Sequence, residues 1–382
     1  MIPRTLFTEE HEMLRDAVRR FLSAEAEPFH AQWEKDGQTD PALWKKAGEQ
    51  GFLCPTLPAE YGGAGADFRY NVVITEEIAN LGLSGIGWGL HSDIVVPYLE
   101  RYGSEEQKQR WLPRCVSGDL VTAIAMTEPG TGSDLQSVRT QAVRTDSGWV
   151  LNGSKTFITN GQHANLIIVV AKTSAGSGAK GISLFVVETD QVQGFERGRN
   201  LHKIGMKAQD TSELFFNDVE LPADALLGEE GRGFVYLMQE LPQERLSVAL
   251  NAIASCEAAL GWTLKYVKER KAFGSNVGSF QNTQFVLADL ATEVQVMRAF
   301  LDRCVELHLD HQLDVPTAAM AKLKGTDLQF RVMDECLQLH GGYGYMTEYP
   351  IARAFVDSRV QRIYAGTNEI MKLIIARAMG LG

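Results

Sequence analysis

The stretch "WVLNGSKTFITNGQHANLIIVVAK" spans residues 149–172 and consists of short runs of β-branched, aromatic and other apolar residues separated by Gly, Asn and Ser. Comparable runs stand at 121–126 (VTAIAM), 182–187 (ISLFVV) and 213–221 (ELFFNDVEL). Runs of this length between turn-forming residues are typical of β-strands. We therefore predict a compact antiparallel sheet domain between residues 121 and 235.

Helical periodicity flanks this region on both sides. Before residue 121, apolar residues recur three and four positions apart, as at Leu14, Val18 and Phe21. After residue 235, a similar spacing continues through Leu246, Leu250, Ile253, Leu260, Leu264 and Val267. It predicts a helix of roughly 30 residues, about 45 Å long, that lies in a bundle. Further helices are predicted at 280–310, 316–340 and 367–379.

These patterns predict an α+β fold with three parts. The first is an all-helical N-terminal domain at 1–120, and the second is a middle β-barrel or sheet domain at 121–235. The third is a helical bundle at 236–382.

Composition excludes several functional classes. The chain has 382 residues, and 48 acidic against 37 basic residues give a net charge of −11, which argues against binding to nucleic acid. The longest apolar run, residues 166–171, is far shorter than the roughly 18 residues of a membrane span, so no transmembrane segment is expected. No HExxH or GxSxG motif occurs, and the eight histidines show no zinc-ligand spacing. No metal site is predicted.

Cysteine usage and the N-terminus bear on the compartment. Five cysteines are present, none in a CxxC pair, which predicts buried thiols in a reducing compartment: Cys54, Cys115, Cys256, Cys304 and Cys336. The first residues, MIPRTLFTEEHEML, carry acidic side chains where signal and transit peptides lack them. We expect a cytoplasmic protein, or one of the mitochondrial matrix if a presequence has been removed.

Five motifs follow one another along the chain: TEPGTGSD (127–134), GSKTFITNG (153–161), ERKAFG (269–274), QLHGGYGY (338–345) and RIYAGTNEIM (362–371). Alone, the first motif could form an anion-cradling loop, but its composition favours a plain connection between strands. Together with the helix–sheet–helix order, the five resemble the acyl-CoA dehydrogenase family over essentially the whole chain. The long-chain members are most similar, through LHKIGMKAQDTSELFF (201–216) and LPQERL (241–246).

This resemblance implies a C-terminal four-helix bundle, FAD as cofactor and an acyl-CoA thioester as substrate. It also implies conversion to the trans-2-enoyl-CoA, as in fatty-acid β-oxidation, with an electron-transfer flavoprotein as acceptor. The implied assembly is a homotetramer, a dimer of dimers.

The resemblance also implies a set of cofactor contacts. Phe157 stands where many relatives have Trp, and Arg270, Phe273 and Gln281 match positions that reach the flavin of a neighbouring subunit. For Phe273, plain core packing is the alternative, and for the glycines a helix C-cap. The implied FAD-binding residues are Thr127, Gly132, Ser133, Phe157, Thr159, Arg270, Phe273, Gln281, Gln338, Gly341, Gly342, Thr367 and Glu369.

The sequence position of the catalytic base differs from the one that is commoner in the family. Many members carry Tyr-Glu-Gly-Thr in the C-terminal loop, where this chain has Tyr364-Ala365-Gly366-Thr367. Long-chain and isovaleryl-type enzymes instead place the glutamate on a long helix before an arginine, and Glu244-Arg245 match that position. The resemblance therefore implies Glu244 as the base, with a pKa raised by burial against the acyl chain. A solvated helix glutamate is the alternative.

The implied substrate contacts are Ser133, Arg245, Tyr364, Ala365 and Gly366. Arg245 matches a contact to the CoA moiety, with a surface ion pair as the alternative. Replacement of Glu by Ala at 365 keeps the backbone N–H that polarises the thioester carbonyl in the family.

Acyl length and branching stay open. The small residues of LGLSGIGWGLHS (81–92) are candidates to line the far end of an acyl cavity, or else to let helices approach closely, and Trp88 is a candidate plug. We expect a substrate with a medium-length, long or methyl-branched acyl chain.

Two other activities are compatible with the sequence. One is an acyl-CoA oxidase or flavin monooxygenase on the same fold, in which dioxygen accepts the electrons. The other is a non-catalytic protein that binds acyl-CoA or acyl carrier protein, suggested only by the missing glutamate at 365.

Overall fold

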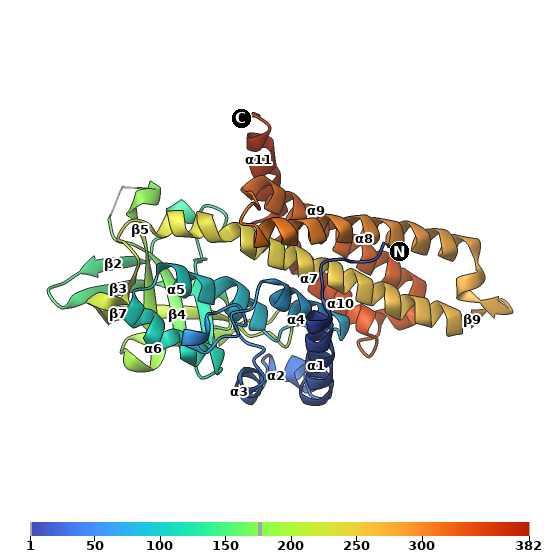
Figure 1. Cartoon of the computed structure of the whole chain (residues 1–382), viewed down its shortest axis with the longest axis horizontal. Coiled ribbons are helices and arrows are strands. Elements are labelled where there is room, and N and C mark those ends of the chain that lie inside the picture. Colours follow the sequence, from blue (N-terminus) through green and yellow to red (C-terminus); the bar gives the residue numbers. More distant parts are fainter. Residues whose placement is uncertain (1, 175–177, 382) are drawn as a thin grey trace.

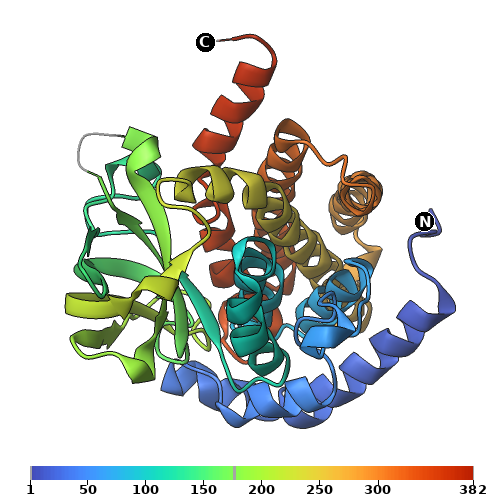
Figure 2. The same cartoon turned by 60° about the vertical axis from the view of Figure 1, so that its left-hand side comes forward.

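A computed structural model describes residues 2–174 and 178–381. The first part of the chain is helical, and a π-helical turn, η2 (Leu90–Val95), runs directly into α5. Figures 1 and 2 show these helices packed beside both the sheet and the long C-terminal helices. The helices are α1 (Glu9–Glu25), α2 (His30–Asp36), α3 (Ala42–Glu49), α4 (Arg69–Asn80), α5 (Val96–Tyr102) and α6 (Glu105–Val116).

The middle part is a sheet with the order β6-β7-β3-β2-β4-β5-β8, to which β1 is added beside β4. The expectation of an antiparallel sheet is wrong in part, because β1 and β2 both pair with β4 in parallel. Along the chain, the β2–β3 hairpin comes between β1 and β4, and it supplies the long connection that parallel pairing of these two strands needs. The strands are β1 (Thr122–Ala125), β2 (Gln141–Arg144), β3 (Gly148–Thr159), β4 (Leu166–Lys172), β5 (Ile182–Glu188), β6 (Phe195–Asn200), β7 (Thr211–Pro222) and β8 (Leu226–Leu227).

Strand β4 joins two hydrophobic cores. Leu166, Ile168 and Val170 pack with the N-terminal helices, whereas Ile167 and Val169 face the interior of the sheet domain. Successive side chains of a strand point to opposite faces, so a strand buried on both faces is apolar throughout. This explains the unbroken run LIIVVA.

Three long helices dominate the C-terminal part, and Figure 1 shows the first of them, α7, extending from the sheet to the small β9–β10 hairpin. Gly325 of α9 brings that helix against Ala249 of α7, where an added Cβ would meet the Ala249 side chain at 3.5 Å. The elements are α7 (Gly233–Glu269), β9 (Lys271–Ala272), β10 (Ser275–Asn276), α8 (Gln281–Leu309), α9 (Val315–His340), α10 (Pro350–Ser358) and α11 (Asn368–Ala378).

The predicted fold class is confirmed, and the helix boundaries lie close to those predicted, although α7 has 37 residues. The exact domain limits at 120 and 235 stay a prediction. All five cysteines are free and buried, as predicted. Within residues 2–174 and 178–381, no helix is both long enough and apolar enough to cross a membrane.

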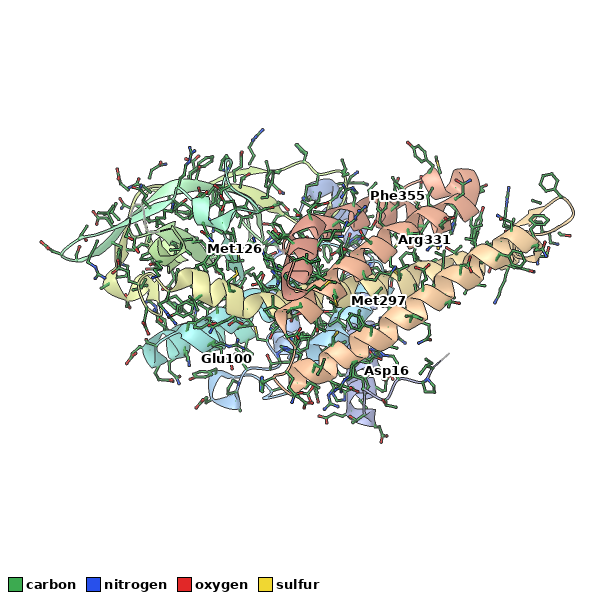
Figure 3. The ribbon with its side chains drawn as sticks, turned by 90° about the horizontal axis from the view of Figure 1, so that it is seen from above. Asp16, Glu100, Met126, Met297, Arg331 and Phe355 are labelled. Carbon is green, nitrogen blue, oxygen red and sulfur yellow. The ribbon has the colours of Figure 1, made fainter. Side chains whose placement is uncertain are left out.

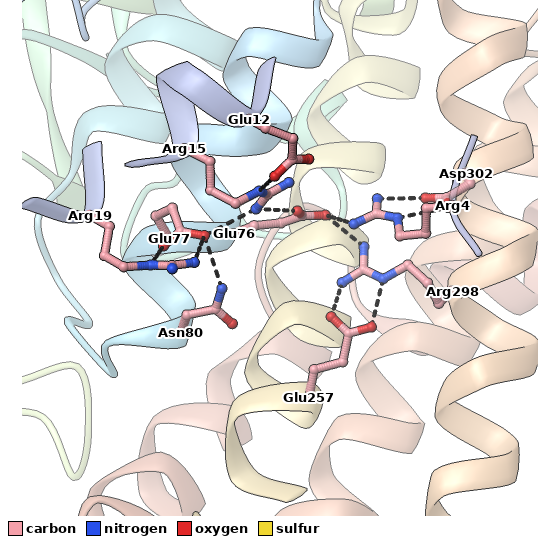
Figure 4. Close-up of polar contacts among 10 residues, drawn as sticks. All are labelled: Arg4, Glu12, Arg15, Arg19, Glu76, Glu77, Asn80, Glu257, Arg298 and Asp302. Carbon is pink, nitrogen blue, oxygen red and sulfur yellow. Dashed lines mark hydrogen bonds and ion pairs between the residues drawn. The ribbon is translucent and has the colours of Figure 1, made fainter. Parts of the chain in front are cut away.

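A buried charge network joins the N-terminal helices to the C-terminal bundle (Figure 4). The Glu76 carboxylate on α4 accepts hydrogen bonds from Arg4, at 2.8 Å, and from Arg298 on α8, at 3.0 Å. Arg15 on α1 lies 3.0 Å from its other oxygen. Burial acts to raise the pKa of Glu76, but the guanidinium groups of Arg298, Arg4 and Arg15 outweigh it and hold the pKa below its ordinary value.

Candidate active site

A cavity of about 340 Å³ lies where the sheet, η2, α7, α9 and the loop before α11 meet. Met126, which lines it, lies at this junction in Figure 3. The cavity brings together six predicted site residues from four distant segments: Thr127, Phe157, Thr159, Glu244, Tyr364 and Ala365.

Glu244 lies in the wall of this cavity and is 5% exposed, which excludes a solvated helix glutamate. The Tyr98 hydroxyl donates to its Oε1 at 2.8 Å. Burial raises the pKa of Glu244 to about 7, the Tyr98 hydrogen bond opposes the rise, and the nearby Glu240 carboxylate adds to it. A carboxyl with such a pKa can accept a proton near neutral pH.

Sequence reasoning missed Tyr98, which lies on α5, 146 residues before Glu244. Nothing in the local sequence marks it, because its role depends on the packing of α5 against α7. It also missed Asp93, a second buried carboxyl in the cavity wall.

Phe157 is exposed although it is a large apolar residue, near the C-terminal end of β3. The pairing of β3 with β7 is interrupted between Lys155 and Ile158, and Phe157 has a φ of +60° and a 66% exposed side chain. A β-bulge re-aims a side chain, and a positive φ at an aromatic residue is strained. The bulge therefore presents an aromatic side chain at the cavity.

The loop that begins at Thr127 is fixed from beneath by a buried ion pair. The Lys155 ammonium group donates to Glu128 Oε1 at 2.9 Å and to the Met126 carbonyl at 3.0 Å. The Glu128 carboxylate accepts from the backbone N–H groups of Arg139 and Thr140. Burial lowers the pKa of Lys155 to about 8, and Glu128 opposes this. This pair holds Thr127 at the cavity mouth.

The loop before α11 carries two consecutive residues in the left-handed region, Ala365 at φ +51° and Gly366 at +86°. The buried ammonium group of Lys322 on α9 donates to the Gly366 carbonyl at 2.7 Å and to Asn368 Oδ1 at 2.9 Å. Among the described residues, the N–H groups of Ala365 and Gly366 donate to no acceptor. Successive free N–H groups in such a conformation form a site for a negatively charged oxygen.

Other predicted cofactor residues lie at the opposite end of α7. Arg270, Gln338, Gly341 and Gly342 line a second cavity of about 520 Å³. Glu269, just before Arg270, lies 25 residues after Glu244, which corresponds to about 38 Å of helix. The structure thus divides the predicted cofactor residues into two groups.

Further residues lie outside both cavities. Phe273 is 98% exposed, so the alternative of core packing is wrong, and Gln281 is exposed at the start of α8. Gly341, which lines the second cavity, has a φ of +58° and also caps α9, as the alternative held. Gly132 and Ser133 are exposed on their loop.

The last two predicted cofactor residues, Thr367 and Glu369, lie at the start of α11. The Thr367 hydroxyl caps α11 by accepting from the Ile370 N–H, and Glu369 is exposed in its first turn. Gly366 lies between the cavity residue Ala365 and this cap.

Arg245 is 4% exposed, and no described residue forms a hydrogen bond or ion pair with its guanidinium group. The alternative of a surface ion pair is therefore wrong. Burial lowers its pKa, and Glu244 opposes this. A buried cation without an anion is costly, so the group is suited to an anionic part of a ligand.

Comparisons with known proteins show which family the chain belongs to. Family models described as acyl-CoA dehydrogenase N-terminal, middle and C-terminal domains match residues 8–119, 123–219 and 231–380. The chain belongs to the acyl-CoA dehydrogenase family. Its members are flavoprotein oxidoreductases, so the expected enzyme class is confirmed.

The chain is similar to the long-chain specific acyl-CoA dehydrogenase of mouse mitochondria, with 54% identity over 98% of this chain and 87% of that protein. It is also similar to the crystal structure of an acyl-CoA dehydrogenase from Geobacillus kaustophilus (TM-score 0.97, 53% identity, 99% and 100% coverage). A glutaryl-CoA dehydrogenase from Mycobacterium smegmatis, solved in complex with FADH2, matches at a TM-score of 0.91 and 28% identity, with 98% and 95% coverage.

Proposed function

We propose that this acyl-CoA dehydrogenase uses FAD to convert a medium-chain, long-chain or methyl-branched acyl-CoA to the trans-2-enoyl-CoA, with Glu244 as the base. The observation that carries the proposal is the placement of Glu244, with its pKa near 7, in one cavity with Ala365 and the exposed Phe157. The residues of α7 that line the cavity run from Glu244 to Trp262, about 27 Å of helix, which favours a long chain.

The residues present fit FAD. The exposed and strained Phe157 supports a flat ring, and Thr127 and Thr159 offer hydroxyl groups beside it. Arg270, Gln338, Gly341 and Gly342 offer a cation, an amide and open backbone for the adenosine and diphosphate end. When bound, FAD supplies the acceptor for the hydride that leaves the β-carbon.

The residues of the chain have two tasks in this reaction. The free N–H groups of Ala365 and Gly366 donate to the thioester oxygen and make the α-C–H more acidic. Glu244 then accepts the α-proton as a carboxylate, while Tyr98 holds that carboxylate in place. Arg245 faces the anionic CoA moiety.

The two groups of cofactor residues support a homo-oligomer. Glu244, in the cavity of the first group, lies roughly 38 Å along α7 from Glu269, which precedes Arg270 of the second group. We therefore assign the two groups to the FAD sites of different chains. Arg270, Phe273 and Gln281 of one chain then complete the site of a neighbour. We propose a dimer of dimers, with an electron-transfer flavoprotein as the electron acceptor, in the cytoplasm or the mitochondrial matrix.

One experiment separates this function from its alternatives. The purified protein is expected to hold about one FAD per chain and to lose its flavin absorbance under anaerobic dodecanoyl-CoA, with one trans-2-dodecenoyl-CoA formed per flavin. On admission of air, slow recovery of absorbance indicates a dehydrogenase and rapid recovery an oxidase. Binding of dodecanoyl-CoA without loss of absorbance would leave only a binding protein.

A further inference from the structure

The wall of the acyl cavity contains a carboxyl group that the proposed reaction does not use. Asp93 lies in η2, is 5% exposed, and lines the same cavity as Glu244. The Asn71 amide donates to its Oδ1, and among the described residues no donor reaches Oδ2. Burial raises the pKa of Asp93 to about 7, and the Asn71 hydrogen bond opposes the rise.

The π-helical turn positions this group. Hydrogen bonds in a π-helix join residues five apart, and such turns are frequent at functional sites. The Gln243 side chain donates to the Asp93 carbonyl at 2.7 Å and so ties the turn to α7 beside Glu244. Asp93 and Glu244 reach the cavity wall from different elements, η2 and α7.

Another unpartnered group lies just before this turn. Trp88 is five residues before Asp93, lines the cavity, and is 1% exposed. Its indole Nε1–H has no acceptor among the described residues. Asp93 therefore gives the cavity wall an unpartnered acceptor, and Trp88 is a lining residue with an unpartnered donor.

These two groups oppose a purely apolar occupant. A hydrocarbon chain that fills the cavity would leave a buried polar group without a partner, which typically costs about 1–3 kcal/mol. A hydroxyl group has one donor and can also accept. It can donate to the Asp93 oxygen and accept from the Trp88 N–H.

We propose that Asp93 is a specificity-determining residue that recognises a hydroxyl group on the acyl chain, with Trp88 as its second partner. The preferred substrates are then acyl-CoA thioesters hydroxylated beyond the β-carbon. This inference rests on the proposed function, because it assigns the cavity to the acyl chain. It leaves the role of Glu244 unchanged.

The test compares binding of unreactive ligands. S-dodecyl-CoA and its 6-, 8-, 10- and 12-hydroxy derivatives are thioethers, so they lack the carbonyl that makes the α-proton acidic. By isothermal titration calorimetry, the parent protein is expected to bind one hydroxy ligand roughly tenfold to a hundredfold tighter than S-dodecyl-CoA. Asp93→Leu should remove this preference, and Trp88→Phe should reduce it.

A matched control comes from the same wall. Ile94→Val changes the cavity shape without removing a hydrogen-bonding group, so it should change the affinity for both ligands by the same factor. If Asp93→Leu does not fold, Trp88→Phe and the preference of the parent protein still decide the question.

The outcomes separate this inference from the proposed function. Equal affinity of the parent protein for all five ligands, or a preference that survives Asp93→Leu, would overturn the role of Asp93 while acyl-CoA still reduces the flavin. Failure of dodecanoyl-CoA and its hydroxy derivatives alike to reduce the bound flavin would instead overturn the proposed function, whatever the thioether affinities.

Discussion

Glu244→Gln is expected to slow the reduction of bound flavin by dodecanoyl-CoA by roughly 10³-fold, while acyl-CoA binding persists. The amide keeps the volume of the side chain and a hydrogen-bonding partner for Tyr98, but it cannot accept the α-proton. Anaerobic stopped-flow absorbance measures the rate, and calorimetry with S-dodecyl-CoA measures the binding.

Glu240→Gln is the matched control. Glu240 lies one turn earlier on α7, is buried, and bonds to Arg101 and Tyr102 rather than lining the cavity. This variant should reduce its flavin within about tenfold of the parent rate. A near-parent rate in Glu244→Gln together with a large loss in Asp93→Asn would assign the base to Asp93 and contradict our site.

Glu76→Gln is expected to lower the free energy of unfolding by about 3–5 kcal/mol, because it leaves Arg298, Arg4 and Arg15 without their shared buried carboxylate. Urea denaturation followed by circular dichroism measures this loss. Glu12→Gln is the control, since Glu12 pairs with Arg15 at the exposed rim of the same network and should cost at most about 1 kcal/mol.

The pH dependence of this loss has a defined sign. The pKa of Glu76 is lower in the folded protein than in the unfolded chain, so its carboxylate stabilises the fold above the unfolded pKa. That contribution is lost as the pH falls through the folded pKa. The difference between Glu76→Gln and the parent should therefore shrink in acid, and a constant difference, or one no larger than that of Glu12→Gln, would contradict this role.

Local patterns were sufficient to predict the main elements. The steps of three and four between Leu246 and Val267 predicted α7, and the run LIIVVA predicted β4. The parallel pairing of β1 with β4 was not predictable in this way. Whether two strands pair in parallel or antiparallel depends on the path of the chain that connects them, and a run of apolar residues does not indicate that path.

The site was predictable only where a motif carried it. Glu244, Phe157 and Ala365 followed from their motifs, and they line one cavity. Tyr98, Lys322 and Asp93 belong to no motif, because contacts between distant elements give them their roles. The bulge that exposes Phe157 arises from the register of β3 against β7, which sequence spacing does not specify.

The central claim is that the Glu244 carboxylate, held by Tyr98, takes the α-proton. The most direct measurement is the anaerobic rate of flavin reduction by saturating dodecanoyl-CoA between about pH 5.5 and 9. Because burial raises the pKa of Glu244 to about 7, the rate should rise with pH to a plateau, with half its maximum near pH 7. In Tyr98→Phe, loss of the hydrogen bond to the carboxylate should move this midpoint to higher pH. A rate that does not change with pH, or a midpoint that Tyr98→Phe leaves in place, would contradict the assignment.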